Sequence, residues 1–242
     1  VRFMHKDISS VAISGKGFEE SLRLHVKNNL KFHYLPNWAD ALDIDLPPAI
    51  LSKDHVIHFT FAGNIGKQQN LENIINAFCL IPEKYNGQSQ LNIIGDGPKL
   101  DDLKNLSINN PSIVFHGKKK REEMSSYFKA SNFLIVSLVD EPIFSLTVPA
   151  KTQTYIAAKK PILAIINGDT ANLVKEHNLG LHAHPSDVAA ITDLFQECIE
   201  MNDEHRAAFA SKNDFLLNNT FNKEKIINQL LEVLIMPSKK SK

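Results

Sequence analysis

One loop of this sequence places two glycines and a lysine between an apolar segment and a helix. The apolar segment VIHFTFAG, residues 56–63, is followed by NIGKQQN and then by LENIINAFCLI, whose apolar residues have helical spacing. Gly63 and Gly66 allow a tight turn and a close approach of the backbone to a ligand. The amides at the start of the helix and the charge of Lys67 favour an anion. The sequence therefore indicates an anion site, although the same residues also suit a simple strand-to-helix turn.

A second helix start carries a proline and a lysine. A polar loop, residues 141–147, leads into VPAKTQTYIAAKKP, which predicts a helix that begins near Pro149 and Ala150 with Lys151 in its first turn. The first turn of a helix has unpaired backbone amides and a partial positive charge. The residues alone leave open what this helix end holds.

Two more glycine loops follow apolar segments. In IIGDGPKLDDL, Gly95 and Gly97 allow a tight loop, and Asp96 can cap the next helix. In VFHGKKKREEM, Gly117 precedes the basic run 118–121, for which a solvated loop is the ordinary interpretation. Taken singly, each loop indicates turn chemistry rather than a binding site.

These loops belong to a repeating strand–helix pattern. Strand and helix segments alternate about six times between Asp54 and Asn219, and the strand segments are apolar without polar–apolar alternation. Strands of this kind are buried on both faces, as in a parallel sheet covered by helices. The predicted fold class is therefore α/β, a doubly wound parallel sheet of Rossmann type. Such sheets bind ligands where loops at the carboxyl ends of strands meet helix N-termini.

Composition and spacing argue against several other classes of protein. Lys and Arg together number 27, as do Asp and Glu, so the near-zero net charge disfavours nucleic-acid binding through a basic face. No apolar run reaches the ~18 residues of a membrane-spanning helix. Cys79 and Cys198 lie in apolar helical patterns, which indicates free thiols in a reducing compartment. The G-x-x-G loop lacks the third glycine of the dinucleotide fingerprint, which disfavours an NAD-dependent dehydrogenase.

No metal site is expected from the sequence. The ten histidines are scattered, and neither cysteine has a partner at metal-ligand spacing. Asp43 and Asp45 form an Asp-x-Asp pair, but this pair lies in a proline-containing linker rather than at the expected sheet edge. His116 is expected to be structural, and His182 and His184 are expected to be surface residues.

Taken together, four motifs resemble the C-terminal domain of family 4 retaining glycosyltransferases. They are AGNIGKQQNLENIINAF, LNIIGDGP, IVFHGKKKREEMSSYFKASNFLIV and VPAKTQTYIAAKKPILA, in the order and spacing of that family. The resemblance is strongest to the bacterial branch that transfers N-acetylated amino sugars, including fucosamine, in O-antigen and capsule synthesis. Such enzymes have the GT-B fold, in which two Rossmann-like domains face a cleft and the C-terminal domain holds most of the nucleotide-sugar donor.

The resemblance implies a division of the chain into unequal parts. The chain would lack most of the acceptor domain, including the catalytic-site histidine of the family, and we expect it to be inactive alone. The expected parts are a remnant of the N-terminal acceptor domain at 1–38, a hinge or linker at 39–53, a Rossmann-like nucleotide-sugar domain at 54–219, a C-terminal helix at 220–236 and a disordered tail at 237–242.

The resemblance also implies a donor site without a metal, in which helix N-termini and lysines attract the diphosphate. The arginine and lysine of the family's first loop fall on Asn64 and Gln69, and the second of its paired glutamates falls on Thr154. The first glutamate is most similar to Glu141, at a longer interval, and Glu141 is the expected catalytic or sugar-binding carboxylate. The expected phosphate-binding residues are Gly63, Asn64, Gly66, Lys67, Ser145 and Lys151, and the expected nucleoside-binding residues are Gly95, Gly97, Gly117, Lys118 and Thr154.

The implied function is transfer of a sugar, with retention of configuration, from a nucleotide-diphosphate donor to a lipid-linked or glycan acceptor. The donor is expected to be UDP-linked and to carry an N-acetylamino sugar, and no cofactor is expected. Two alternatives remain: a non-catalytic GT-B partner subunit that scaffolds or regulates an active transferase, and a nucleotide-sugar 2-epimerase. The expected location is cytoplasmic, with peripheral association at the inner face of the plasma membrane through the missing N-terminal domain.

Overall fold

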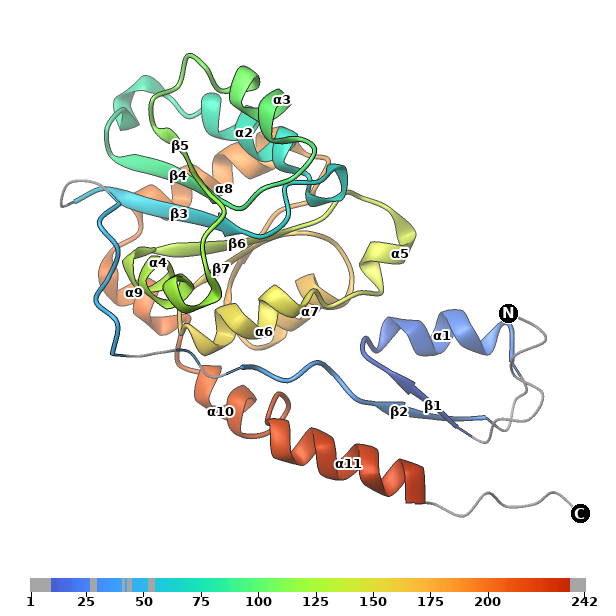
Figure 1. The fold of residues 1–242 in the computed structure, drawn as a ribbon. Helices are drawn as coiled ribbons and strands as arrows, with labels where there is room; N and C mark the ends of the chain where they lie inside the picture. The colour runs from blue at the N-terminus through green and yellow to red at the C-terminus, as the bar shows by residue number, and fades with distance from the viewer. Residues whose placement is uncertain (1–9, 27–29, 41, 43–44, 52–54, 236–242) are drawn as a thin grey trace, which may run out of the picture.

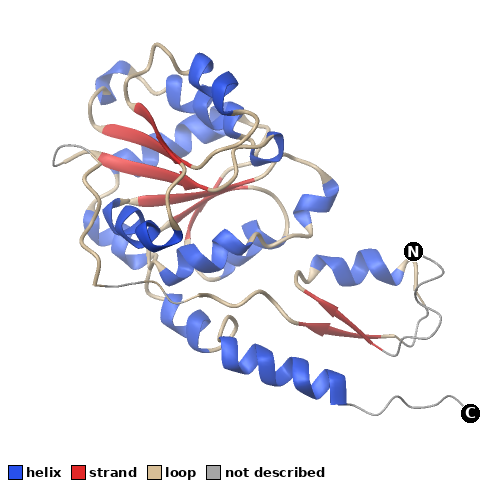
Figure 2. Ribbon diagram, viewed as in Figure 1, coloured by secondary structure: helices blue, strands red, loops and turns tan. Residues whose placement is uncertain are grey.

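The computed structural model describes residues 10–26, 30–40, 42, 45–51 and 55–235. The expected disordered tail, 237–242, and Asp43 lie outside this part of the chain. The described residues form a six-stranded parallel sheet with helices on both faces, and a smaller two-stranded parallel sheet (Figures 1 and 2).

The large sheet has the strand order of a doubly wound α/β domain. Its order is β5-β4-β3-β6-β7-β8, and every neighbouring pair is parallel. The direction of strand addition reverses between β3 and β6, which is where such folds form their ligand crevice. The predicted fold class is therefore confirmed. The strands are β3 (Ile57–Ala62), β4 (Ser89–Ile94), β5 (Ile113–Gly117), β6 (Phe133–Ser137), β7 (Ile162–Ile165) and β8 (Gly180–His182).

Helices cover both faces of this sheet, as right-handed crossovers between parallel strands require. One face carries α2 (Leu71–Cys79), α3 (Leu100–Leu106) and α8 (Val188–Glu200). The other face carries α4 (Met124–Ala130), α6 (Ala150–Ala157), α7 (Asp169–Glu176) and α10 (Asn213–Asn218). The remaining helices between residues 55 and 235 are the 3₁₀ turns η1 (Lys67–Gln69), η2 (Glu83–Tyr85) and η3 (Arg121–Glu123), with α5 (Pro142–Ser145), α9 (Asp203–Ala208) and α11 (Lys223–Ile235).

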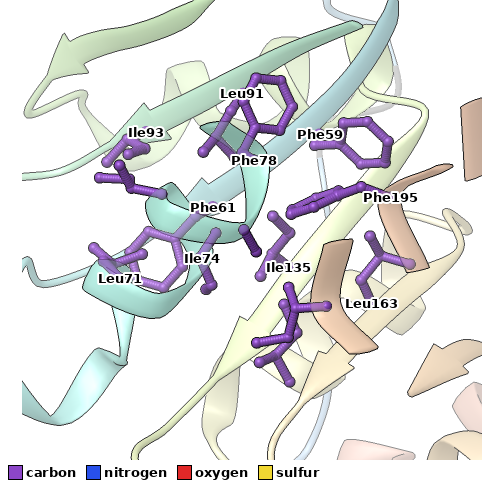
Figure 3. Packing of buried hydrophobic residues seen from close by; sticks show 14 of the residues in the cluster. Phe59, Phe61, Leu71, Ile74, Phe78, Leu91, Ile93, Ile135, Leu163 and Phe195 are labelled. Atoms are coloured by element: carbon purple, nitrogen blue, oxygen red, sulfur yellow. The ribbon is translucent and has the colours of Figure 1, made fainter. Parts of the chain in front are cut away.

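The first face is held by an aromatic cluster. Phe59 is fully buried and lies with its ring centroid 5.4 Å from that of Phe133 and 4.8 Å from that of Phe195 on α8. Phe78 of α2 packs edge-on against both Phe59 and Phe195 (Figure 3). These contacts clamp α2 and α8 onto β3, the strand that leads into the first glycine loop.

The second face is partly polar, which the apolar appearance of the strands did not predict. Gln90 and Asn92 of β4 are buried there, and the Nε2 of Gln90 donates to the Oδ1 of Asn92 over 2.7 Å. The same Oδ1 lies 2.8 Å from His116 Nε2, and the Nδ2 of Asn92 lies 3.3 Å from His58 Nδ1. The interpretation of His116 as a structural residue fits this network. One ring nitrogen of each histidine thus has Asn92 as its polar partner.

The predicted polar loop that follows β6 contains a short helix, and one expected surface histidine is half-buried. Helix α5 (Pro142–Ser145) begins directly after Glu141, whose backbone is extended. His182 of β8 lies with its Nε2 3.0 Å from the carbonyl oxygen of Ile166, so it is not a freely solvated residue. His184 is exposed, as expected.

The N-terminal residues form a small βαβ unit that lies away from the large sheet (Figure 1). It consists of β1 (Ser10–Ile13), α1 (Gly17–Arg23) and β2 (Lys31–Tyr34), with β1 and β2 parallel. The amide of Gly17 donates to the Oδ2 of Asp169 at the start of α7 over 2.8 Å. The following linker is tied to the large domain by a bond from the Ala49 amide to the Ser126 carbonyl oxygen, at 3.0 Å.

We predict that the protein loses stability below pH 6.5 because of the buried histidines. Burial lowers the pKa values of His58 and His116, so the folded state resists a proton that the unfolded chain accepts near pH 6.5. Their contribution is fully present above that pH and is lost as the pH falls through the lowered folded-state pKa values. Urea midpoints measured from pH 5 to pH 8 should therefore fall on the acid side.

The variant His116→Gln supplies the control for this effect. A glutamine can still donate to Asn92 but does not titrate, so its midpoint should fall less steeply between pH 6.5 and pH 5 than that of the natural protein. Parallel curves for the two proteins would show that His116 does not contribute to the acid sensitivity.

Candidate functional site

A cavity of about 860 Å³ lies at the carboxyl ends of β3 and β4 and against the start of α6. This is the edge of the sheet, at the carboxyl ends of the strands, that the fold predicts for a ligand. The cavity is lined by Ala62, Gly63, Asn64, Ile94, Gly95, Asp96, Gly97, Lys118, Lys119, Met124, Phe128, Ala150, Lys151, Thr154 and Tyr155.

Backbone groups of the glycine loops form part of this lining. β3 and β4 end side by side, with Ala62 paired to Ile94, so the loops that follow start at the same level. The amide of Gly63 donates to the Ile94 carbonyl oxygen over 2.9 Å, and the amide of Gly95 donates to the Gly117 carbonyl oxygen over 3.0 Å. A Cβ atom at Gly95 would overlap the carbonyl oxygen of Gly63. The glycine at position 95 is thus required by the packing of two backbones.

The ammonium of Lys151 crosses from α6 to the first glycine loop. Its Nζ donates to the Oε1 of Gln69 over 2.8 Å and lies 3.9 Å from the ring centroid of Phe61, a cation–π distance. A Cβ atom at Gly63 would stand 2.9 Å from the same Nζ. Gly63 therefore leaves the space that the lysine uses, in addition to turning the chain with a φ of 149°.

Burial changes the proton affinity of this lysine. Removal from water disfavours the charged amine and lowers the pKa of Lys151 to about 7. The ammonium forms no ion pair with a carboxylate in the part of the chain that the structure describes. A negative group in the cavity would stabilise the charged form of Lys151.

Part of the cavity lining is apolar. The hydroxyl of Tyr155 accepts from the Ala62 amide over 3.2 Å and donates to the Ala62 carbonyl oxygen over 3.4 Å, which joins α6 to the end of β3. Burial raises the pKa of Tyr155, so this residue remains a neutral phenol. Met124 and Phe128 complete the apolar part of the lining. The cavity can thus hold a ligand with a flat apolar part and an anionic part.

The structure gathers seven of the predicted site residues in this lining. They come from three loops and one helix that are far apart in the sequence, and they are Gly63, Asn64, Gly95, Gly97, Lys118, Lys151 and Thr154.

Five predicted site residues do not line the cavity. Lys67 is exposed on η1, and Gly66 is buried beside it. Ser145 uses its hydroxyl to bond the Pro142 carbonyl oxygen over 2.8 Å. Glu141 is exposed before α5. Gly117 acts through its carbonyl oxygen, which supports Gly95.

Sequence reasoning did not select several residues that shape the site. Gln69 appeared only as a substituted family position, and Lys119 only as part of a basic run. The ammonium of Lys119 lies 5.5 Å from the ring centroid of Tyr127, and a hydrogen bond to Tyr127 raises the pKa of that lysine. Asp96, which was considered a helix cap, bonds the Gly97 amide over 2.8 Å and lines the cavity. A search for cations and carboxylates in the loops after the strands could have found Lys119 and Asp96.

The described ranges contain no group of three or more His, Cys, Asp or Glu side chains that could hold a metal ion. None of the helices placed by the structure is long and apolar enough to span a bilayer.

The fold and its cavity define a Rossmann-like α/β domain with a cavity at the carboxyl ends of β3 and β4. The family described as glycosyl transferases group 1 matches residues 45–214, and the chain belongs to this family. A probable glycosyltransferase of Pseudomonas aeruginosa, WbjE, is 26% identical over 214 residues, which cover 82% of this chain. The chain spans about half of that relative, 52% of its length.

Solved structures support the same fold. Sucrose-phosphate synthase from Thermosynechococcus elongatus superimposes with a TM-score of 0.77 at 19% identity, over 96% of this chain and 59% of that one. S. aureus TarM, in a complex with Fondaparinux, alpha-GlcNAc-glycerol and UDP, gives a TM-score of 0.73 at 12% identity, over 97% of this chain and 45% of that one. The six-stranded domain therefore has the Rossmann-like architecture of GT-B glycosyltransferases.

We predict that Gly95→Ala destabilises the protein far more than Gly117→Ala. Both glycines have positive φ, 145° and 67°, which costs an L residue about 1–2 kcal/mol. Only at Gly95 would the new methyl group also collide with backbone, whereas nothing lies within 4 Å of a Cβ at Gly117. The expected losses in the free energy of unfolding are roughly 3–5 kcal/mol at Gly95 and about 1 kcal/mol at Gly117. Urea unfolding measures both, and equal losses would contradict the close approach of the two loops.

Proposed function

We propose that the chain is the donor-binding half of a retaining glycosyltransferase that uses a UDP-linked sugar. The observation that carries the proposal is the enclosed ammonium of Lys151, which faces the cavity with a neutral hydrogen-bond partner, Gln69. A diphosphate carries negative charge on oxygen atoms that accept charge-assisted hydrogen bonds from an ammonium. Cytoplasmic nucleotide sugars would supply it, and no cofactor is needed.

The cavity offers suitable surroundings for each part of such a donor. The apolar wall formed by Met124, Phe128 and Tyr155 can receive a base and ribose, and Lys118 and Lys119 stand at the rim. Lys151 at the start of α6 would face the diphosphate. Negative charge grows on the diphosphate as its bond to the sugar breaks. A cation and helix amides that are fixed in place would therefore stabilise the transition state. Lys151 and the helix amides would thus stabilise the leaving diphosphate, as a metal ion does in other transferases.

The relatives are consistent with this proposal. Family membership supports sugar transfer, and the TarM complex contains UDP together with an N-acetylglucosamine glycoside. We extend the proposal to an N-acetylamino sugar donor and to a lipid-linked or glycan acceptor, as in the fucosamine-type branch. The match covers about half of WbjE. We propose that the matched part is the C-terminal half and that a further domain binds the acceptor. Peripheral association with the inner face of the plasma membrane would follow from a lipid-linked acceptor.

One observation favours a second candidate, a non-catalytic partner subunit. Glu141 is exposed and outside the cavity lining, and Thr154 bonds the Ala150 carbonyl oxygen of its own helix over 3.3 Å. The family's glutamate pair is therefore not reproduced in the cavity. In a transferase, Glu141 would reach the sugar only when the second domain closes.

We predict that the full-length protein which contains this chain transfers or hydrolyses the donor. UDP release from UDP-N-acetylglucosamine and UDP-N-acetylfucosamine, measured with and without glycan acceptors, tests this directly. Glu141→Gln should lower the rate at least tenfold with little change in UDP affinity, because a catalytic carboxylate acts on the sugar rather than on the nucleotide. Binding of UDP without any turnover would assign the protein to the partner class instead.

We also predict that Lys151→Met weakens UDP binding about tenfold without loss of stability. The change removes a charge-assisted contact of roughly 1.5–3 kcal/mol, and it also removes the cost of burying an ammonium. The matched control is Lys159→Met at the other end of α6, where the ammonium pairs with Asp214 at 2.7 Å. Calorimetry should show unchanged UDP affinity for this control. Equal affinities for both variants would remove Lys151 from the phosphate site.

A further inference from the structure

Gln69 occupies a fixed place next to the Lys151 ammonium. It is the last residue of η1, and its backbone amide donates to the Gly66 carbonyl oxygen over 3.0 Å. Its own carbonyl oxygen accepts from the hydroxyl of Ser137, a fully buried residue at the end of β6, over 2.5 Å. The Gln69 backbone is therefore attached to the sheet at the switch point, and the side chain extends from a rigid base.

The neighbouring residue reinforces this attachment. Asn70 has a left-handed backbone with a φ of 56°, and its buried side chain donates to the Pro185 carbonyl oxygen over 2.8 Å. The amide of Val139 donates to the Gln68 carbonyl oxygen over 2.9 Å. Bonds from two separate segments thus hold the residues on either side of Gln69, so its amide group can direct a flexible lysine.

We propose that Gln69 is a positioning residue that aims the Lys151 ammonium at the cavity while leaving its positive charge free for a ligand. The amide oxygen accepts one ammonium proton, the Phe61 ring covers one side, and Gly63 provides the space next to Nζ. A glutamate at position 69 would also fix the ammonium, but its carboxylate would neutralise the charge that a diphosphate needs. This inference rests on the proposed function only for the identity of the ligand.

The charge state of Lys151 is set by a small number of neighbours. Its partners on β3 and η1, Phe61 and Gln69, are uncharged, while Lys67 on η1 is exposed. The cavity lining adds Asp96 from the loop after β4 and Lys118 and Lys119 from the loop after β5. These groups stay the same when only position 69 is changed. With a Lys151 pKa of about 7, a new group at position 69 changes the charged fraction near neutral pH.

The direct test is the titration of Lys151 itself in the protein without ligand. The Nζ and Cε resonances are followed by NMR from pH 5.5 to pH 10.5, and Lys151→Met assigns the signal. Gln69→Met removes the acceptor and should lower the midpoint, whereas Gln69→Glu should raise it by at least one pH unit. Gln68→Met, at an exposed neighbouring position, is the matched control and should leave the midpoint in place. Unchanged midpoints in both Gln69 variants would overturn the positioning role.

The second readout is binding of UDP-N-acetylglucosamine by calorimetry from pH 6 to pH 8. Neither its esterified phosphates nor its uracil ring titrates in this range, so a pH dependence reports on the protein. Affinity for the natural protein should fall as the pH rises through 7, and Lys151→Met should flatten the profile. Gln69→Glu should bind about tenfold more weakly at pH 7, although its lysine is fully charged.

The two readouts separate the positioning role from the proposed function. A purely structural role of Gln69 would weaken binding equally at every pH with no shift of the profile, and this result would overturn the inference. Shifted Lys151 midpoints without binding of UDP-N-acetylglucosamine by any form would support the positioning role and refute the proposed UDP-sugar ligand.

Discussion

The site depends on how closely the loops after β3 and β4 approach each other. Hydrogen bonds continue beyond the ends of these strands. The amide of Ile65 donates to the Asp96 carbonyl oxygen over 2.8 Å, and the amide of Lys99 donates to the Ile65 carbonyl oxygen over 3.0 Å. A Cβ atom at Gly97 would lie 2.5 Å from the Ile65 carbonyl oxygen. Because the two backbones are in contact, no side chain fits between them. The cavity lies next to this contact and is lined by the loop residues and by α6.

The charge next to the first glycine loop comes from α6 rather than from that loop itself. Asn64 and Gln69, the positions on which the resemblance places an arginine and a lysine, are uncharged here. Lys151 brings its ammonium to within 2.8 Å of the Gln69 side chain from the opposite side. Burial of that ammonium costs free energy in the empty protein, and a bound anion would offset the cost. The empty site therefore lowers the stability of the folded protein, and a bound anion would restore it.

Much of the fold could be predicted from the sequence because parallel strands buried on both faces leave a clear pattern of apolar runs ending in glycine. The same pattern located the loops of the site, since the carboxyl ends of parallel strands share one edge. The pairing of Lys151 with Gln69 could not be predicted, because 82 residues separate them and only the packing of α6 on β3 brings them together. The buried Gln90 and Asn92 were missed because they also have partners on other elements, the Leu51 carbonyl oxygen for Gln90 and His116 for Asn92. The place of Glu141 depends on α5, whose four residues are too few for a periodic pattern.

The contact between the N-terminal unit and the large domain has a mechanical consequence. Gly15 and Gly17 pack so tightly on Leu146 and Asp169 that a Cβ at Gly15 would overlap the Leu146 carbonyl oxygen. Leu146 lies on the same short segment that leads into Pro149, the residue before the first turn of α6. Any rotation of the N-terminal unit must therefore break these contacts or displace the segment that leads into α6, the helix on which Lys151 lies. The position of the N-terminal unit is thus coupled to the start of the helix at the cavity.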